Sequence, residues 1–117
     1  MKFLEVTDKK TENAFIRLPV SLYRDDPNWI RPLDKDLREV FDPKKNKYFR
    51  TGKAVRWILI DSRGKTIGRI AAFYEKKIAS SYDQPTGGMG FFECIEDKAA
   101  AFMLFDKAKE WLKQEGM

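Results

Sequence analysis

The sequence predicts an α+β domain in which a mostly antiparallel sheet of about four strands has helices on both faces, giving α/β/α layers. Three observations lead to this fold class. Segment 54–77 has the pattern of a β-hairpin around a glycine turn. Its strands are apolar on both sides, which requires helices to cover both faces of the sheet. A glycine-flanked strand, 87–95, then leads directly into an amphipathic helix.

The composition fits a single domain over residues 1–117. Hydrophobic residues make up 43% of the chain and charged residues 35%, which is compatible with a packed core. No apolar run reaches the ~18 residues of a membrane span, and the N-terminus becomes charged too early for a signal peptide. We therefore expect a cytoplasmic protein with no membrane partner, and the single Cys94 agrees with a reducing compartment.

The chain contains no histidine, and this excludes Ser-His and Cys-His catalytic pairs and the common imidazole metal sites. Acid–base chemistry must then come from Asp, Glu, Tyr, Lys or Cys. The adjacent carboxylates Asp25 and Asp26 rarely hold a hard cation without further ligands, so we expect no metal. The net charge of +5 favours anionic partners, although an ordinary basic surface also accounts for it.

The N-terminal part is predicted to be a strand followed by short helices. Residues 2–6 alternate weakly between apolar and polar, as in a short strand. Thr7 or Asp8 can cap a helix over 11–17. Because proline interrupts helices, we expect this helix to end near Arg17 and a second helix to begin around Pro19.

A short helix and a basic loop precede the hairpin. Asp34 is predicted to cap a helix over 35–41. In the loop 42–53, we favour a solvated connector whose aromatic residues Tyr48 and Phe49 pack into the core. The alternative is a weak nucleic-acid or anion binder that uses phosphate contacts and stacking. No RNA-binding signature is present, so we do not expect nucleic acid as a partner. The basic residues of the loop are Lys44, Lys45, Lys47, Arg50 and Lys53.

The strands of the hairpin carry large apolar residues on alternating faces. In 55–60, odd-numbered residues are expected on one face, and Ile58 and Ile60 on the other. Arg56 and Arg69 interrupt this pattern. They either pair across the hairpin or reach acids in the N-terminal helices.

The last two elements are a strand with an irregularity and the clearest helix of the chain. Gly88 and Gly90 predict a bulge or a close backbone approach within 87–95. The helix 97–115 begins with acids and ends with lysines, which suits the helix dipole. Its apolar stripe consists of Ala101, Leu104, Phe105, Ala108, Trp111 and Leu112.

The order of these elements resembles the first half of the GNAT (N-acetyltransferase) fold, and four phrases resemble the N-terminal region of bacterial GNAT-like proteins. The resemblance implies a GNAT-like N-terminal, partial domain of an acyl-CoA-dependent N-acyltransferase. Because the fifth strand of that fold is missing, we expect the chain to be inactive by itself. The matching phrases are 15–19 (FIRLP), 22–29 (LYRDDPNW), 68–73 (GRIAAF) and 90–93 (GFFE).

In that family, acyl-CoA lies between the fourth and fifth strands, and its pyrophosphate binds amides at the start of the following helix. The resemblance thus implies acetyl-CoA or another acyl-CoA as cofactor. The junction departs from the family pattern, because it has no glycine and carries Glu96 and Asp97 where phosphates would arrive. The implied strand wall is Phe92, Glu93, Cys94 and Ile95, and the implied phosphate end is Asp97, Lys98, Ala99 and Ala100.

Two of these side chains have alternative interpretations. Glu93 is the candidate general base, but we favour a strand residue that faces solvent or an arginine. Cys94 is a candidate nucleophile, but without a local base we favour a small apolar core residue.

The alternative function belongs to another class, a stand-alone interaction module. An exposed edge of strand 87–95, or helix 97–115, would then form a homodimer.

Overall fold

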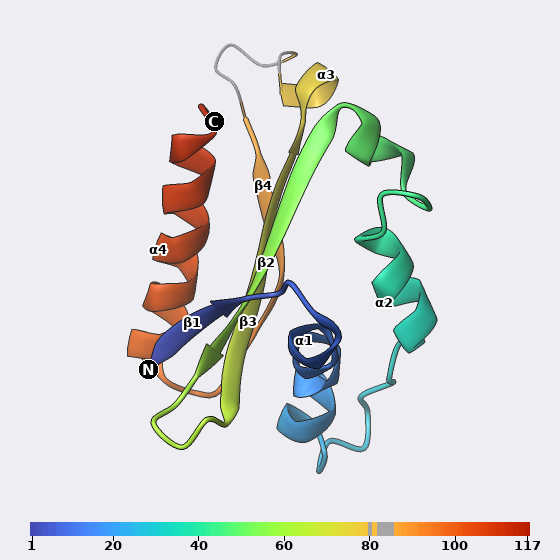
Figure 1. The fold of residues 1–117 in the computed structure, drawn as a ribbon. Coiled ribbons are helices and arrows are strands. Elements are labelled where there is room, and N and C mark those ends of the chain that lie inside the picture. Colours follow the sequence, from blue (N-terminus) through green and yellow to red (C-terminus); the bar gives the residue numbers. More distant parts are fainter. Residues whose placement is uncertain (80, 82–85) are drawn as a thin grey trace.

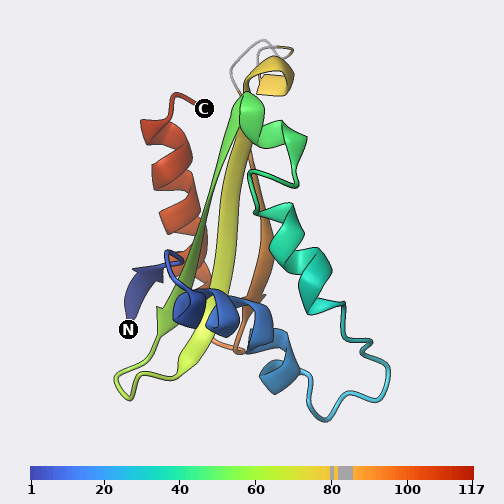
Figure 2. The same ribbon diagram turned by 45° about the vertical axis from the view of Figure 1, so that its right-hand side comes forward.

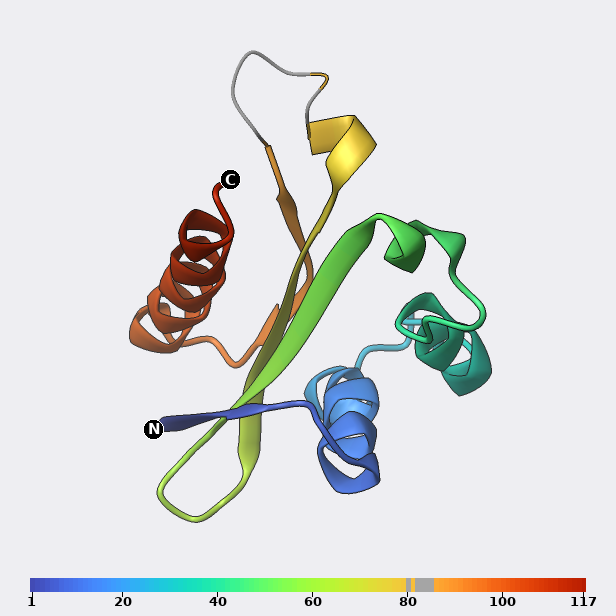
Figure 3. The same ribbon diagram turned by 45° about the horizontal axis from the view of Figure 1, so that its top comes forward.

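The computed structural model describes residues 1–79, 81 and 86–117, and over these residues it contains one antiparallel sheet in the order β1–β2–β3–β4. Helices α1 and α2 cover one face of the sheet and α4 covers the other (Figure 1). Two further views show the same separation (Figure 2, Figure 3). The predicted α+β class is confirmed. The elements are β1 (Lys2–Glu5), α1 (Lys9–Leu22), α2 (Asp34–Val40), the 3₁₀ helix η1 (Lys47–Arg50), β2 (Gly52–Ile60), β3 (Thr66–Glu75), α3 (Lys76–Ala79), β4 (Gly88–Cys94) and α4 (Lys98–Gln114).

The core has one layer on each side of the sheet, as the alternation of the hairpin predicts. Trp57 and Leu59 pack with Leu104 of α4, whereas Ile58 packs with Phe15 of α1. In the described part of the chain, no helix has the length and apolar character that a membrane crossing requires.

Helix α1 runs without a break through Pro19, so the prediction of two helices divided there was wrong. A proline lacks the N–H that would bond the carbonyl four residues earlier, which is that of Phe15. Here the Nη1 of Arg69 in β3 donates to this carbonyl at 2.7 Å. The tertiary contact thus supplies the hydrogen bond that the local sequence cannot. Asp8, one of the two predicted candidates, caps the helix.

Two other local predictions needed correction. Leu33, not Asp34, occupies the N-cap of α2, and the Asp34 carboxylate instead pairs with Arg31 at 2.9 Å. Tyr48 does not pack into the core, because it is 56% exposed. Phe49 is half-buried. Both aromatic residues lie on η1 and line a hollow against the sheet.

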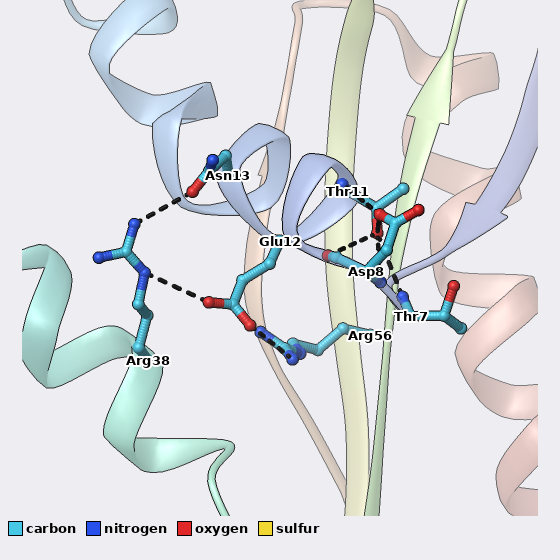
Figure 4. A network of polar contacts seen from close by, with 7 residues as sticks. All are labelled: Thr7, Asp8, Thr11, Glu12, Asn13, Arg38 and Arg56. Atoms are coloured by element: carbon cyan, nitrogen blue, oxygen red, sulfur yellow. Dashed lines mark hydrogen bonds and ion pairs between the residues drawn. The ribbon is translucent and has the colours of Figure 1, made fainter.

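Charged side chains attach α2 to α1 and to the sheet (Figure 4). Arg38 of α2 pairs with Glu12 at 3.2 Å and donates to Asn13 at 3.0 Å. Arg56 of β2 pairs with the other carboxylate oxygen of Glu12 at 3.6 Å, as one of the two alternatives for this arginine predicted. Burial lowers the pKa of Arg56, and the charge of Glu12 opposes that shift. The network therefore links α2 to α1 and to β2.

Candidate functional site

The predicted irregularity of β4 is a β-bulge. Arg69 of β3 is opposite Glu93, and Ala71 is opposite Gly90, so two β4 residues face a single residue of β3. Phe91 within the bulge has a φ of +57°, which is uncommon for a residue other than glycine. Bulges redirect side chains, and this one lies next to Glu93.

Arg69 holds the bulge against α1. Its side chain is buried, with 5% of the residue exposed. Its Nε donates to the Phe91 carbonyl at 2.9 Å, and its Nη1 donates to the Phe15 carbonyl. The guanidinium also lies 4.8 Å from the centroid of the Phe15 ring. Burial lowers the pKa of Arg69, and the charge of Glu93 is the main opposing influence.

Glu93 accepts a hydrogen bond from the hydroxyl of Tyr23 at 2.5 Å, and this joins β4 to the C-terminal cap of α1. The hydrogen bond raises the pKa of Tyr23 above its ordinary value of 10.0, with burial and the charge of Glu93 adding to the shift. Within the described residues, no second hydrogen-bond partner of the Glu93 carboxylate is seen. Glu93 also lines a small cavity of about 60 Å³ with Arg69 and Trp29.

This arrangement combines three groups that acid–base chemistry can use: a carboxylate, a tyrosine hydroxyl and a buried cation. The partner of Glu93 is a tyrosine hydroxyl, while Arg69 acts on it through charge. The sequence interpretation assigned no role to Tyr23, although this residue lies in one of the phrases that resemble the GNAT-like proteins. Tyr23 and Glu93 lie seventy positions apart in the sequence, so no local pattern could have predicted their hydrogen bond.

The other residues of the predicted strand wall turn toward α4. Phe92 is 37% exposed and stacks on Phe105 at 4.5 Å between centroids. Cys94 and Ile95 pack against the α4 core layer. Burial, followed by the charge of Asp97, raises the pKa of the Cys94 thiol, which disfavours the reactive thiolate. Over the described residues, β4 pairs with β3 alone, so its outer edge is open.

The predicted phosphate end does not fit a phosphate group. The carboxylate of Asp97 caps α4 and accepts from the amides of Ala99 at 2.8 Å and Ala100 at 3.2 Å. These are the N–H groups that an anion at a helix N-terminus needs. Ala100 is fully buried, while Lys98 is exposed. An acyl-CoA pyrophosphate at this junction would meet a carboxylate and two occupied donors.

An apolar cavity of about 440 Å³ opens on the α1–α2 face of the sheet. The end of α2, η1 and the first half of β4 form its walls, with Phe91 at the bulge. Gly88 allows the ring of Phe73 to lie against β4, since a Cβ at this position would approach the ring to 2.8 Å. No signal in the sequence predicted this cavity. In the described part of the chain, no cluster of acidic residues and cysteine has the arrangement of a metal site.

Comparison with known proteins finds two curated relatives. The chain is 35% identical over 116 residues to protein YghO of Escherichia coli K12, which covers 97% of this chain and 28% of YghO. It is 38% identical over 107 residues to a bacterial ceramide synthase of Caulobacter vibrioides, which covers 87% of this chain and 27% of that protein. No protein-family model and no solved structure matches the chain. The chain thus spans somewhat more than a quarter of the length of these relatives.

Proposed function

We propose that this chain is the N-terminal part of a GNAT-like, acyl-CoA-dependent N-acyltransferase, and that it supplies the site for the amine that is acylated. The observation that carries the proposal is the Glu93 carboxylate at the β4 bulge, oriented by Tyr23 and lying beside the buried Arg69. The order of elements supports it, because a bulged strand follows an antiparallel hairpin and leads into a helix.

The name of one relative supports the same class of reaction. A ceramide is an amide of a fatty acid and a long-chain amino alcohol, so a ceramide synthase joins an acyl group to an amine. Transferred to this chain, the name favours an amine with a long alkyl chain as the acceptor. Both the acceptor and the acyl-CoA donor belong to this proposal.

In the proposed reaction, the amine nitrogen attacks the thioester carbonyl of the donor, and Glu93 takes the proton that the amine loses as the new C–N bond forms. The thioester C–S bond breaks, and CoA leaves as its thiol once its thiolate has regained a proton. The Tyr23 hydroxyl holds one carboxylate oxygen, Oε2, and the other oxygen is left to accept this proton. Arg69 lies directly opposite Glu93 on the neighbouring strand. The N-terminus of α4 does not fit the phosphates of the donor, so we place no donor contact at that junction.

The test replaces Glu93 by glutamine in the full-length protein. The assay measures the acylation of a long-chain amino alcohol by palmitoyl-CoA, and the free thiol that the reaction releases is the quantity detected. Loss of a general base is expected to lower kcat/KM by about 10²- to 10⁴-fold. Glu96→Gln is the matched control, because Glu96 is an exposed glutamate close by in the same chain, and it is expected to remain within about twofold of the wild type. A fully active Glu93→Gln enzyme would refute the assignment.

A second candidate function is the interaction module. The open outer edge of β4 favours it, together with the exposed side chains of Met89 and Phe92 on that strand and of Phe102 on α4. In this case, a strand of a second copy pairs with β4.

A further inference from the structure

We propose that the apolar cavity between α2, η1 and the sheet binds a long-chain fatty acid in its anionic form, with the alkyl chain inside and the carboxylate at a basic rim. This site goes beyond the proposed function, because it shares no lining residue with the small cavity at Glu93. Its ligand is therefore independent of the reaction assigned to Glu93.

The cavity exists because the helical layer over the inner strand β3 is incomplete. Helix α1 packs over one end of this strand, where Arg69 and Ala71 are buried. Phe73, two residues further on the same face, is 38% exposed. The residues that pair with Phe73 are both small, Ala54 on β2 and Gly88 on β4. The sheet thus fills little of the space beneath η1.

The lining of the cavity gathers exposed apolar surface and suits a single alkyl chain. Its volume of about 440 Å³ lies within the range of ~300–1,000 Å³ that is usual for small-molecule sites. Along β4 the lining runs from Gly87 to Phe91, at most about 13 Å, which an extended decyl chain spans. Apolar surface left open to water at a concave site is typical of ligand sites. Four of the ten large hydrophobic residues that are exposed in the described part of the chain line this cavity: Val40, Tyr48, Phe73 and Ile78.

The rim of the cavity carries positive charge. Lys47 and Arg50 lie on η1, and the Nζ of Lys47 is 6.0 Å from the ring centroid of Tyr48, a lining residue. Lys76 begins α3, and its amide donates to the Thr51 carbonyl just after η1 at 2.9 Å. Both short helices lie at the same end of the sheet (Figure 1). All three side chains are exposed, and within residues 1–79, 81 and 86–117 none of them forms an ion pair.

The two charged residues of the lining already have partners within the chain. Lys53 pairs with Glu115 at 3.1 Å. The Glu75 carboxylate accepts from the Thr51 hydroxyl and, at 2.8 Å, from the amide of Ile78. Neither residue therefore supplies a counter-charge to the three cations of the rim.

Charge complementarity selects a fatty carboxylate as the occupant. Its alkyl chain matches the apolar lining, and its head supplies the negative charge that the basic rim lacks. The head of a long-chain amine would instead add a further cation to the rim, which like charges disfavour. A second copy of the chain placed symmetrically on this surface would bring the same cations against one another.

The test titrates hexanoate, octanoate and decanoate into the chain by calorimetry, each below its micelle concentration and at about pH 8, where carboxylates are ionised. Burial of one methylene is expected to tighten binding roughly fourfold. Decanoate should thus bind at least about a hundredfold more tightly than hexanoate when all four additional methylenes are buried. A ratio below about fourfold means that less than one methylene is buried, and it would overturn the proposal.

Two variants locate the alkyl chain, with a matched control. Ile78→Asp adds a carboxylate to the cavity wall at a residue that is 51% exposed, and it should remove most of the chain-length dependence. Ile30→Asp makes the same change at a residue that is 86% exposed and does not line the cavity, and it should bind as the wild type does. Ala54→Phe fills space beside Phe73 and should weaken decanoate more than hexanoate. Equal losses in Ile78→Asp and Ile30→Asp would overturn the location.

A second pair of variants locates the carboxylate. Lys47→Gln with Arg50→Gln removes two charges from the rim. Arg63→Gln with Lys65→Gln removes the same charge from exposed residues of the β2–β3 turn, at the opposite end of the sheet (Figure 1). The rim variant should weaken decanoate and leave the chain-length dependence intact, whereas the turn variant should bind as the wild type does. Equal effects of the two double variants would overturn the placement of the head.

The head group and the source of the lipid are tested with the same chain length. Decanoate should bind about three- to tenfold more tightly than decanol at low salt, because exposed charge pairs contribute modestly, and added salt should reduce this advantage. Decanol or decylamine that binds as tightly as decanoate would overturn the assignment to an anion. Sedimentation of the chain with phosphatidylglycerol vesicles, without binding of monomeric decanoate, would overturn the single-lipid site in favour of a membrane surface.

Discussion

Replacing Arg69 by methionine removes the buried guanidinium that bonds the Phe91 carbonyl of the β4 bulge and the Phe15 carbonyl of α1. Methionine keeps an unbranched apolar side chain in the same space. Each buried carbonyl left without a donor costs about 1–3 kcal/mol, hence about 2–6 kcal/mol for both. Relief of the desolvation of Arg69 offsets part of this loss. We expect the free energy of unfolding to fall by about 2–4 kcal/mol.

A double-mutant cycle with Pro19→Ala isolates the bond to α1. An alanine at position 19 restores the N–H that bonds the Phe15 carbonyl within the helix. Arg69→Met then leaves only the Phe91 carbonyl unpaired, so its effect should shrink by about 1–3 kcal/mol in the Pro19→Ala background. Urea unfolding of the four proteins, followed by tryptophan fluorescence, measures the difference.

The control for this cycle is Arg17→Met, which changes an exposed arginine of the same helix and should alter stability by no more than about 0.5 kcal/mol. If Arg69→Met lost the same free energy in both backgrounds, within about 0.5 kcal/mol, Arg69 would not be the partner of the carbonyl that Pro19 leaves free.

Because of its hydrogen bond to Glu93, we expect Tyr23 to ionise with a pKa above the ordinary value of 10.0. The absorbance of tyrosinate measures this ionisation, and the pKa of Tyr23 should fall in Glu93→Gln. Because the raised pKa favours protonated Tyr23 in the folded state, its contribution to stability is complete below about pH 10 and is lost as pH rises through the raised pKa. Light scattering tests the open β4 edge: we expect a dimer, and Met89→Lys should return it to a monomer. A wild-type monomer in dilute solution contradicts the interaction module.

Much of the fold follows from local patterns. The alternation of 55–60 predicted which residues meet each helical layer, since side chains of a strand alternate between its faces. Gly88 and Gly90 predicted either a bulge or a close backbone approach in this strand, and the structure shows a bulge directly after Gly90. The prediction that the helix ends before Pro19 failed because it considered only the N–H that proline lacks. The hydrogen bond that replaces it comes from Arg69, which lies fifty-four positions from Phe15 along the chain. The prediction for Asp34 failed for a local reason, because its carboxylate pairs with Arg31, three residues earlier in the chain.

For the candidate site, the sequence named Glu93 as the candidate base, but it did not indicate the environment of that residue. Its partner Tyr23 and the nearby Arg69 come from other elements, and their relation to it exists only once α1 lies against the bulge. The residues expected at the phosphate end were placed correctly at the start of α4. Their amides, however, are occupied by the Asp97 side chain, which only the cap geometry reveals.

By itself, the sequence determined the α+β class, the sidedness of the hairpin, an irregularity within the last strand and the absence of histidine from this chain. These properties depend on composition and on periods of two or 3.6 residues, which neighbouring residues encode. The tertiary structure decided the uninterrupted α1, the Tyr23–Glu93 pair, the buried Arg69 and the apolar cavity. Each of these joins groups that are distant along the chain, so their energies arise only when the two helical layers pack on the sheet.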